Sequence, residues 1–155
     1  MFYGCTVLTG VTIPDGVNSI GYSTFCGCTG LTSIAIPERV TAIGDEAFKN
    51  CTGITDVVVS DSVTEIGYRA FEGCSSLTSI TLPFVGATKD GSKNTHFGYI
   101  FGAFHYGGNP TCVPSGLQTL IITGGTSIAD CAFYYCTGLT SIEMPNSMTS
   151  IGSRA

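Results

Sequence analysis

The stretch Cys28–Asn50, CTGLTSIAIPERVTAIGDEAFKN, decides the fold of this chain because it recurs with a constant period. Four cysteines follow one another at intervals of 23 residues: Cys5, Cys28, Cys51 and Cys74. After each cysteine come, in the same order, an aliphatic residue, two alternating aliphatic residues, in most copies a proline, and an Ile-Gly pair. The first three copies close on a phenylalanine. A fixed period of this length predicts an array of similar supersecondary units that share one continuous core.

The repeat divides the chain into three regular units, one expanded unit, one short unit and one truncated unit. Their boundaries are 5–27, 28–50, 51–73, 74–113, 114–135 and 136–155. Within the expanded unit, Ile100, Ala103 and Phe104 match the closing I-G-x-x-A-F of a regular unit. The first residues already belong to the repeat, and neither end carries a polar cap. We therefore expect a single solenoid domain that is part of a longer array, with no cleavable leader in this chain.

The pattern within one unit predicts its local structure. Alternation over Leu31–Ile36 predicts a short strand with its aliphatic side chains inward, ended by Pro37. The I-G-x-x-A-F segment is too short for a long helix and predicts a single helical or 3₁₀ turn on the outer side. A glycine recurs after the isoleucine, as in Gly44 and Gly67, which predicts either a positive φ or a close backbone approach. Parallel pairing of successive strands at about 4.8 Å gives an α/β solenoid.

This pattern resembles the leucine-rich repeats of the BspA type, which occur in bacterial and protist surface proteins. The resemblance covers nearly the whole chain and is clearest in Cys28–Asn50. It implies an extracellular or cell-surface location and a role in adhesion or in binding host or matrix proteins. No residue-level binding motif carries over from the family.

Composition and charge argue against two classes of partner. The chain is 43% apolar and 11% charged, yet no stretch approaches the roughly 20 consecutive apolar residues of a membrane-spanning helix. The net charge is −5, and the six basic residues do not cluster. Nucleic-acid binding needs a basic stripe that releases counterions, so we expect neither nucleic acid nor membrane insertion.

The eight cysteines divide into two groups. Five occupy the repeat position and are expected to form a column of free, buried thiols: Cys5, Cys28, Cys51, Cys74 and Cys136. Side chains at equivalent positions point the same way, which suits a disulfide poorly. The other three, Cys26, Cys112 and Cys131, are expected at exposed positions, where reaction or pairing with another chain stays open.

The chain offers no convincing catalytic or metal-binding set. Cys26 and Cys28, with His96, His105 and Cys112, lack the second close ligand pair of a structural zinc site. The stretch 86–93 resembles a phosphate-binding loop, but Gly-Ser-Lys stands where Gly-Lys-Ser/Thr is required. We expect no enzyme, no cofactor and no metal.

Two surfaces remain as candidates for partner binding. The first is the exposed face of the strands, with Thr12, Ala35, Val58, Thr81, Ile121 and Glu143 as candidate contacts. The second is the insert 84–113, where Phe97, Tyr99, His105 and Tyr106 lie among glycines. Aromatic residues dominate interface hot spots, and insertions in repeats project from one face. The alternatives are a strand face that is simply solvated and insert aromatics, such as Phe101 and Phe104, that belong to the core.

These observations favour a non-catalytic adhesion or interaction module that binds a host or matrix protein or a glycan. The alternative is a structural spacer that projects another domain. A third hypothesis, an enzymatic activity carried by the insert, has the least support.

Overall fold

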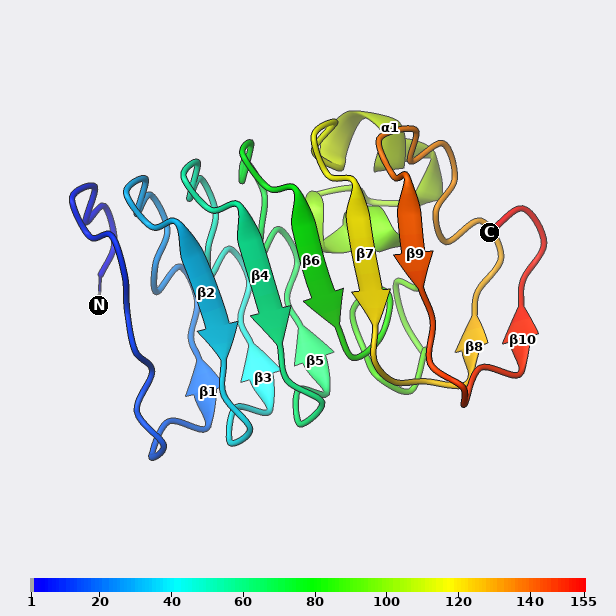
Figure 1. Cartoon of the computed structure of the whole chain (residues 1–155), viewed down its shortest axis with the longest axis horizontal. Helices are drawn as coiled ribbons and strands as arrows, with labels where there is room; N and C mark the ends of the chain where they lie inside the picture. Colours follow the sequence, from blue (N-terminus) through cyan, green and yellow to red (C-terminus); the bar gives the residue numbers. More distant parts are fainter. Residues whose placement is uncertain (1) are drawn as a thin grey trace.

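A computed structural model describes residues 2–155 as a solenoid of stacked coils (Figure 1). Its main sheet has five parallel strands, one from each of five successive units, hydrogen-bonded in the order β2-β4-β6-β7-β9. They are β2 (Ser33–Ile36), β4 (Asp56–Val59), β6 (Ser79–Leu82), β7 (Thr119–Ile122) and β9 (Ser141–Glu143). The predicted repeat solenoid with short parallel strands is confirmed.

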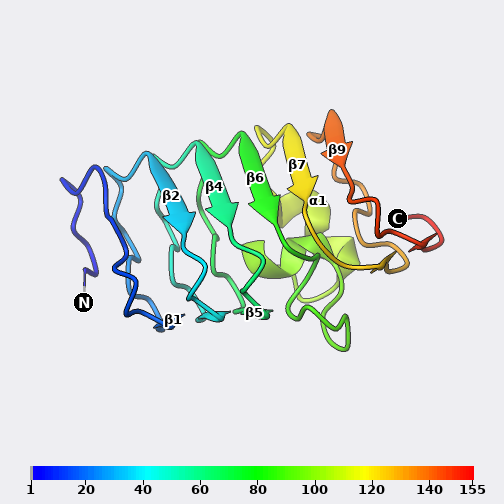
Figure 2. The same ribbon diagram turned by 60° about the horizontal axis from the view of Figure 1, so that its bottom comes forward.

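Five of the six coils also carry a second, two-residue strand that the sequence reasoning did not predict, and the expanded unit 74–113 carries none. β1 (Ser19–Ile20), β3 (Ala42–Ile43) and β5 (Glu65–Ile66) form one parallel sheet. β8 (Ser127–Ile128) and β10 (Ser150–Ile151) form another. Figures 1 and 2 show these strands on the side of the coils away from the main sheet, with the chain of the insert between β5 and β8.

The helices all lie in the insert. They are two 3₁₀ helices, η1 (Phe97–Phe101) and η2 (Tyr106–Gly108), and the single turn α1 (Asn109–Cys112). β6 nevertheless pairs directly with β7, with Ile80 opposite Leu120, so the insert leaves the main sheet unbroken. In residues 2–155, no helix is both long and apolar enough to cross a membrane.

Of the five cysteines at the repeat position, Cys28, Cys51 and Cys74 stand in single file inside the coils, as predicted, whereas Cys5 and Cys136 are half-buried and not buried as expected. Cys28, Cys51 and Cys74 are each 0% exposed. The Cys51 thiol donates a hydrogen bond to the Phe25 carbonyl oxygen at 3.0 Å, and equivalent bonds join Cys28 to Phe2 and Cys74 to Phe48. Each cysteine therefore fills a small core site and also satisfies a backbone acceptor in the neighbouring coil.

The phenylalanines form a second column. Successive rings of Phe2, Phe25, Phe48 and Phe71 stack 5.3–5.4 Å apart with interplanar angles of 4–6°. Offset-stacked rings at this spacing attract one another in addition to the area they bury. The stack ends where the insert begins.

The match of Phe104 to the phenylalanine of the expanded unit was wrong. Phe71 N donates to Ile100 O, just as Phe48 N donates to Ala70 O in a regular unit. The residue after Ile100, Phe101, therefore takes the core position and is 1% exposed, whereas Phe104 is 78% exposed. The 3₁₀ turn of η1 shifts the alignment by three residues.

In the regular units the outer segments form turns with alternating hydrogen bonds, and the helical and 3₁₀ turns of residues 2–155 lie in the insert. Ala47 N donates to Gly44 O three residues back, but Phe48 N donates to Ala70 of the next coil. Glu46 and Asn50 adopt positive φ values of 56° and 58° between these bonds. Because every second donor reaches the next coil, the segment cannot continue as a helix.

The recurrent glycine is required by a close backbone approach. A Cβ on Gly44 would lie 2.9 Å from the carbonyl carbon of Gly21, and one on Gly67 would lie 2.5 Å from that of Gly44. Neither glycine is among the residues with positive φ. Of the two explanations that the sequence left open, the structure selects the close approach.

Candidate functional site

The main sheet presents an in-register row of side chains to solvent. Pairing places five residues opposite one another on adjacent strands: Ala35, Val58, Thr81, Ile121 and Glu143. We call them the strand row. Its side chains repeat at the strand spacing of about 4.8 Å. Ala35, Val58 and Glu143 are exposed, while Thr81 and Ile121 are half-buried. Thr12 is exposed but lies outside the paired strands.

Hydroxyl groups hold the strands of this sheet in register. Thr55 Oγ1 donates to Thr32 O at 3.3 Å, and Thr78 Oγ1 donates to Thr55 O at 3.1 Å. Beside the strand row runs a second row of mostly hydroxyl side chains: Ser33, Asp56, Ser79, Thr119 and Ser141. The face is thus a regular array of small groups in which Val58, 49% exposed, is the most exposed large apolar side chain.

The structure divides the four insert candidates. Phe97 is 0% exposed and its N–H donates to Ala132 O at 2.8 Å, so it is a core residue and its expected place at a binding surface was wrong. Its ring packs edge-on against Phe101 and Phe133. Tyr99 is half-buried; His105 and Tyr106 are exposed.

Buried polar side chains that the sequence reasoning missed hold the insert in place. Asn109 is 0% exposed; its Oδ1 accepts from Gly98 N at 2.9 Å and its Nδ2 donates to Ala132 O at 3.0 Å. His96 Nε2 lies 2.9 Å from Ala103 O. A hydrogen-bonded asparagine in the core fixes the insert against the following unit.

Tyrosines of the short unit extend the aromatic surface of the insert. Tyr106 lies 5.4 Å from Tyr134, which lies 4.6 Å from Tyr135, between ring centroids. His105 packs edge-on against Tyr106 at 6.2 Å. We call these four residues the aromatic patch. Tyr134 and Tyr135 were not predicted because they reach the insert only through the stacking of coils.

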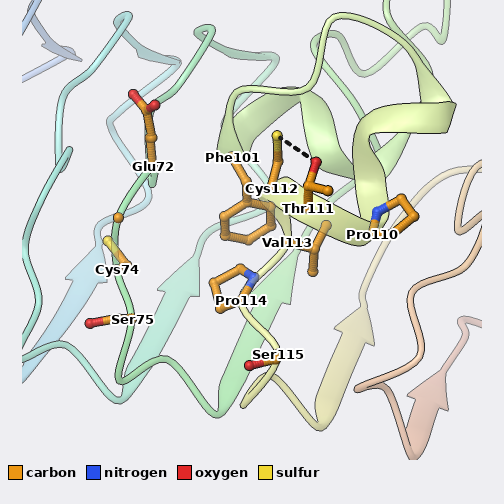
Figure 3. A pocket seen from close by; sticks show the side chains of 11 residues that line it. Glu72, Cys74, Ser75, Phe101, Pro110, Thr111, Cys112, Val113, Pro114 and Ser115 are labelled. Atoms are coloured by element: carbon orange, nitrogen blue, oxygen red, sulfur yellow. Dashed lines mark hydrogen bonds between the residues drawn. The ribbon is translucent and has the colours of Figure 1, made fainter.

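A groove of about 430 Å³ lies where the insert meets the outer turn of the third unit. Figure 3 shows Phe101, Val113 and Pro114 on one side of it, with Glu72 and Ser75 on the other. Glu72 is already paired with Lys49 at 2.9 Å. The groove therefore combines an apolar wall with a neutralised carboxylate and offers no free charge for a specific ligand.

The charged side chains of the outer turns pair with one another. Lys49 lies 3.1 Å from Glu46, and Arg69 lies 3.6 Å from Glu72. The hydrogen bonds that Lys49 donates to Glu72 and Glu46 raise the pKa of Lys49, and the bond that Glu46 accepts lowers the pKa of the Glu46 carboxyl. Lys49 also lies 2.9 Å from Glu72 and Arg69 lies 3.8 Å from Glu46, so the cluster bridges adjacent coils and its arrangement is structural.

All three cysteines outside the column are less exposed than expected, and Cys26 differs most. Cys26 was expected to be exposed but is 7% exposed, because its turn folds back under the next coil; burial, followed by the nearby Glu46 carboxylate, raises its pKa. Cys112 and Cys131 are half-buried, and all eight cysteines are free thiols. In residues 2–155, no group of three or more His, Cys, Asp or Glu side chains is arranged to hold a metal ion.

These burial differences predict the order of thiol reactivity. Burial raises the pKa of Cys51 to about 12, so its thiolate is scarce at neutral pH and also inaccessible. Iodoacetamide at pH 8 is expected to alkylate Cys112 and Cys131 while leaving Cys51 and Cys74 unmodified in the native protein, as read by peptide mass spectrometry. Labelling in urea, where all thiols react, is the control. Equal native labelling of Cys51 and Cys112 would contradict the buried column.

The geometry therefore defines a repeat protein whose coils present a flat strand face and an aromatic insert. The model for the BspA type leucine rich repeat region matches residues 1–91 and 114–155 in six copies. This chain belongs to the BspA-type leucine-rich repeat family.

Three solved structures are similar to this chain, and the first two, with TM-scores above 0.5, share its fold. The T. pallidum leucine-rich repeat protein is 29% identical with a TM-score of 0.64, and the match covers 97% of this chain and 63% of that one. A leucine-rich repeat protein from Eubacterium ventriosum is 20% identical with a TM-score of 0.59, covering 90% of this chain and 40% of that one. A leucine-rich cell surface protein from Faecalibacterium prausnitzii is 32% identical with a TM-score of 0.48, covering 89% and 34%.

The chain thus spans less than two thirds of the length of these structures. No curated protein matches it. Family membership makes the chain a binding or structural repeat module.

Proposed function

We propose that this chain is a surface-exposed adhesion or interaction module that binds a protein or glycan partner without catalysis. The observation that carries the proposal is the strand row, five side chains in register across adjacent strands. Repeat arrays of this kind bind extended partners by many small contacts along such a surface. The surface location is supported by the association of the family with surface proteins.

The aromatic patch is proposed as a second contact region. Tyr135 is 64% exposed and Tyr106 is 47% exposed, and their rings are braced by Tyr134 between them. Pre-packed aromatic rings give contact area at little cost in side-chain entropy. Of the insert residues, His105 and Tyr106 stay as proposed contacts, as does the half-buried Tyr99, whereas the buried Phe97 is no longer a candidate.

The test is binding of the whole chain to panels of immobilised matrix proteins and glycans, followed by substitution. Val58→Asp places a charge within the strand row, on its most exposed large apolar side chain. It is expected to weaken saturable binding at least about tenfold, because it desolvates a carboxylate against the partner. Surface plasmon resonance gives the dissociation constants.

Val7→Asp is the matched control, since Val7 is 89% exposed and lies outside the row. It should leave binding unchanged. Tyr106→Ala, compared in the same assay, separates the aromatic patch from the strand row. An absence of saturable binding to every panel member would contradict the proposal and favour the spacer.

A further inference from the structure

The second sheet is interrupted at the insert. β1, β3 and β5 are paired, and so are β8 and β10, but no pairing joins β5 to β8 in the described chain, residues 2–155. The main sheet continues through the same units without a break. One rung of the second sheet is therefore missing in the expanded unit (Figure 1).

The insert covers one of the two edges that this gap creates. Ile66 N donates to Ala87 O at 2.9 Å, and Lys89 N donates to Thr64 O at 3.0 Å. Thr88 forms an antiparallel bridge with Glu65. The loop thus pairs with β5, and β8 faces it from across the gap.

The edge of β8 has backbone donors without partners. In the units that contain β3, β5 and β10, the residues on either side of the short strand each donate a backbone N–H to the preceding coil. The N–H groups of Thr64 and Gly67, for example, reach Thr41 O at 2.8 Å and Ile43 O at 2.7 Å. The equivalent donors of the short unit belong to Thr126 and Ala129. Neither has a hydrogen-bond partner within residues 2–155, although Thr126 O accepts from the next coil. Backbone donors of this kind are a template for another strand.

A residue identity supports the gap independently. Ala129 stands where the regular units have glycine, such as Gly44, whose Cβ would meet the preceding backbone at 2.9 Å. A methyl group is accommodated at position 129, where β8 pairs with β10 and with no strand of the preceding unit in residues 2–155. An incoming chain can therefore follow the edge as far as Ile128 but must then leave the path of a regular unit.

A groove with an apolar floor adjoins this edge. It has a volume of about 300 Å³ and is bounded by the loop 88–91 and by 124–128. Phe84, Ile122 and Ile128 line it and are 4%, 2% and 5% exposed, with half-buried Val85 beside them. An extended chain alternates its side chains, so one aliphatic residue can face this floor while its backbone meets the strand edge.

We propose that the free edge of β8, together with this groove, binds a short extended segment of a partner polypeptide as an added strand. The backbone carbonyls of the segment accept hydrogen bonds from Thr126 and Ala129, and an aliphatic side chain enters the groove. Main-chain bonds supply affinity and the groove supplies selectivity, as in strand addition elsewhere. This site lies on the second sheet and is independent of the strand row.

The experiment is selection of a displayed library of random dodecapeptides against the whole chain, with affinities measured on synthetic peptides. Enriched peptides are expected to carry an aliphatic residue within an extended, proline-free stretch. Thr126→Pro removes one donor and should weaken their binding by about fivefold or more, the effect of losing one hydrogen bond. Thr126→Ala keeps the N–H and should leave the affinity unchanged.

Amide exchange followed by NMR tests the site without any variant. In the free protein, the amides of Thr126 and Ala129 should exchange faster than those of Thr149 and Gly152, which are bonded to the preceding coil. A selected peptide should slow Thr126 and Ala129. Failure to enrich any peptide, or peptides that leave these two amides unprotected, would overturn the proposal.

Discussion

Phe48→Ala is expected to lower the free energy of unfolding by about 3–5 kcal/mol, the usual loss when a buried phenylalanine is truncated. Phe48 is 0% exposed and stacks on Phe25 at 5.3 Å and on Phe71 at 5.4 Å. Its removal breaks the column in the middle, and the coils of a solenoid are stabilised only by their neighbours. Urea denaturation followed by circular dichroism measures the loss.

Phe104→Ala is the matched control. Its ring is 78% exposed, so truncation should change the stability by no more than about 0.5 kcal/mol. The comparison also tests the corrected alignment of the expanded unit. If both variants lost the same stability, Phe104 would have to belong to the core, and the stack would not be the main support of the regular coils.

Gly67→Ala should also be costly, lowering the free energy of unfolding by about 2–3 kcal/mol. The new methyl group would lie 2.5 Å from the carbonyl carbon of Gly44 and close to the Asp45 backbone and carboxylate. Since these neighbours are mostly backbone atoms, the coils must separate locally to admit it. Thermal and urea unfolding of the variant give the size of the effect.

The same substitution at Gly21 provides the control. A Cβ there would meet only Thr24 Oγ1, at 3.6 Å, because no preceding coil approaches it closely. Gly21→Ala is expected to be neutral or stabilising by up to about 1 kcal/mol, through the lower entropy of the unfolded chain. A similar loss at both positions would show that the glycine is needed for its backbone conformation and not for the close approach.

The sequence predicted the candidate surface only in part. The alternation of the strands correctly placed Ala35, Val58 and Glu143 outward, because side chains on a strand alternate regardless of what surrounds it. Within the insert, the expectation that Phe97 contributes to a binding surface failed, since no period indicates which aromatic residue of a glycine-rich segment turns inward. Tyr134 contacts Tyr106 only because the short unit stacks on the insert, and the sequence pattern does not show which residues of two units come together.

The period of 23 residues by itself determined the coil, its inward aliphatic residues and the column of cysteines. These features repeat because each coil packs on a near copy of itself. The same residue pattern therefore meets the same neighbours in each coil and packs in the same way. Only the tertiary structure decided where that regularity fails. Three features depend on contacts between the insert and units distant in sequence. They are the burial of Phe101, the hydrogen bonds of Asn109 and the unpaired backbone donors beside β8. Such contacts are specific to one place in the array, and no repeat encodes them.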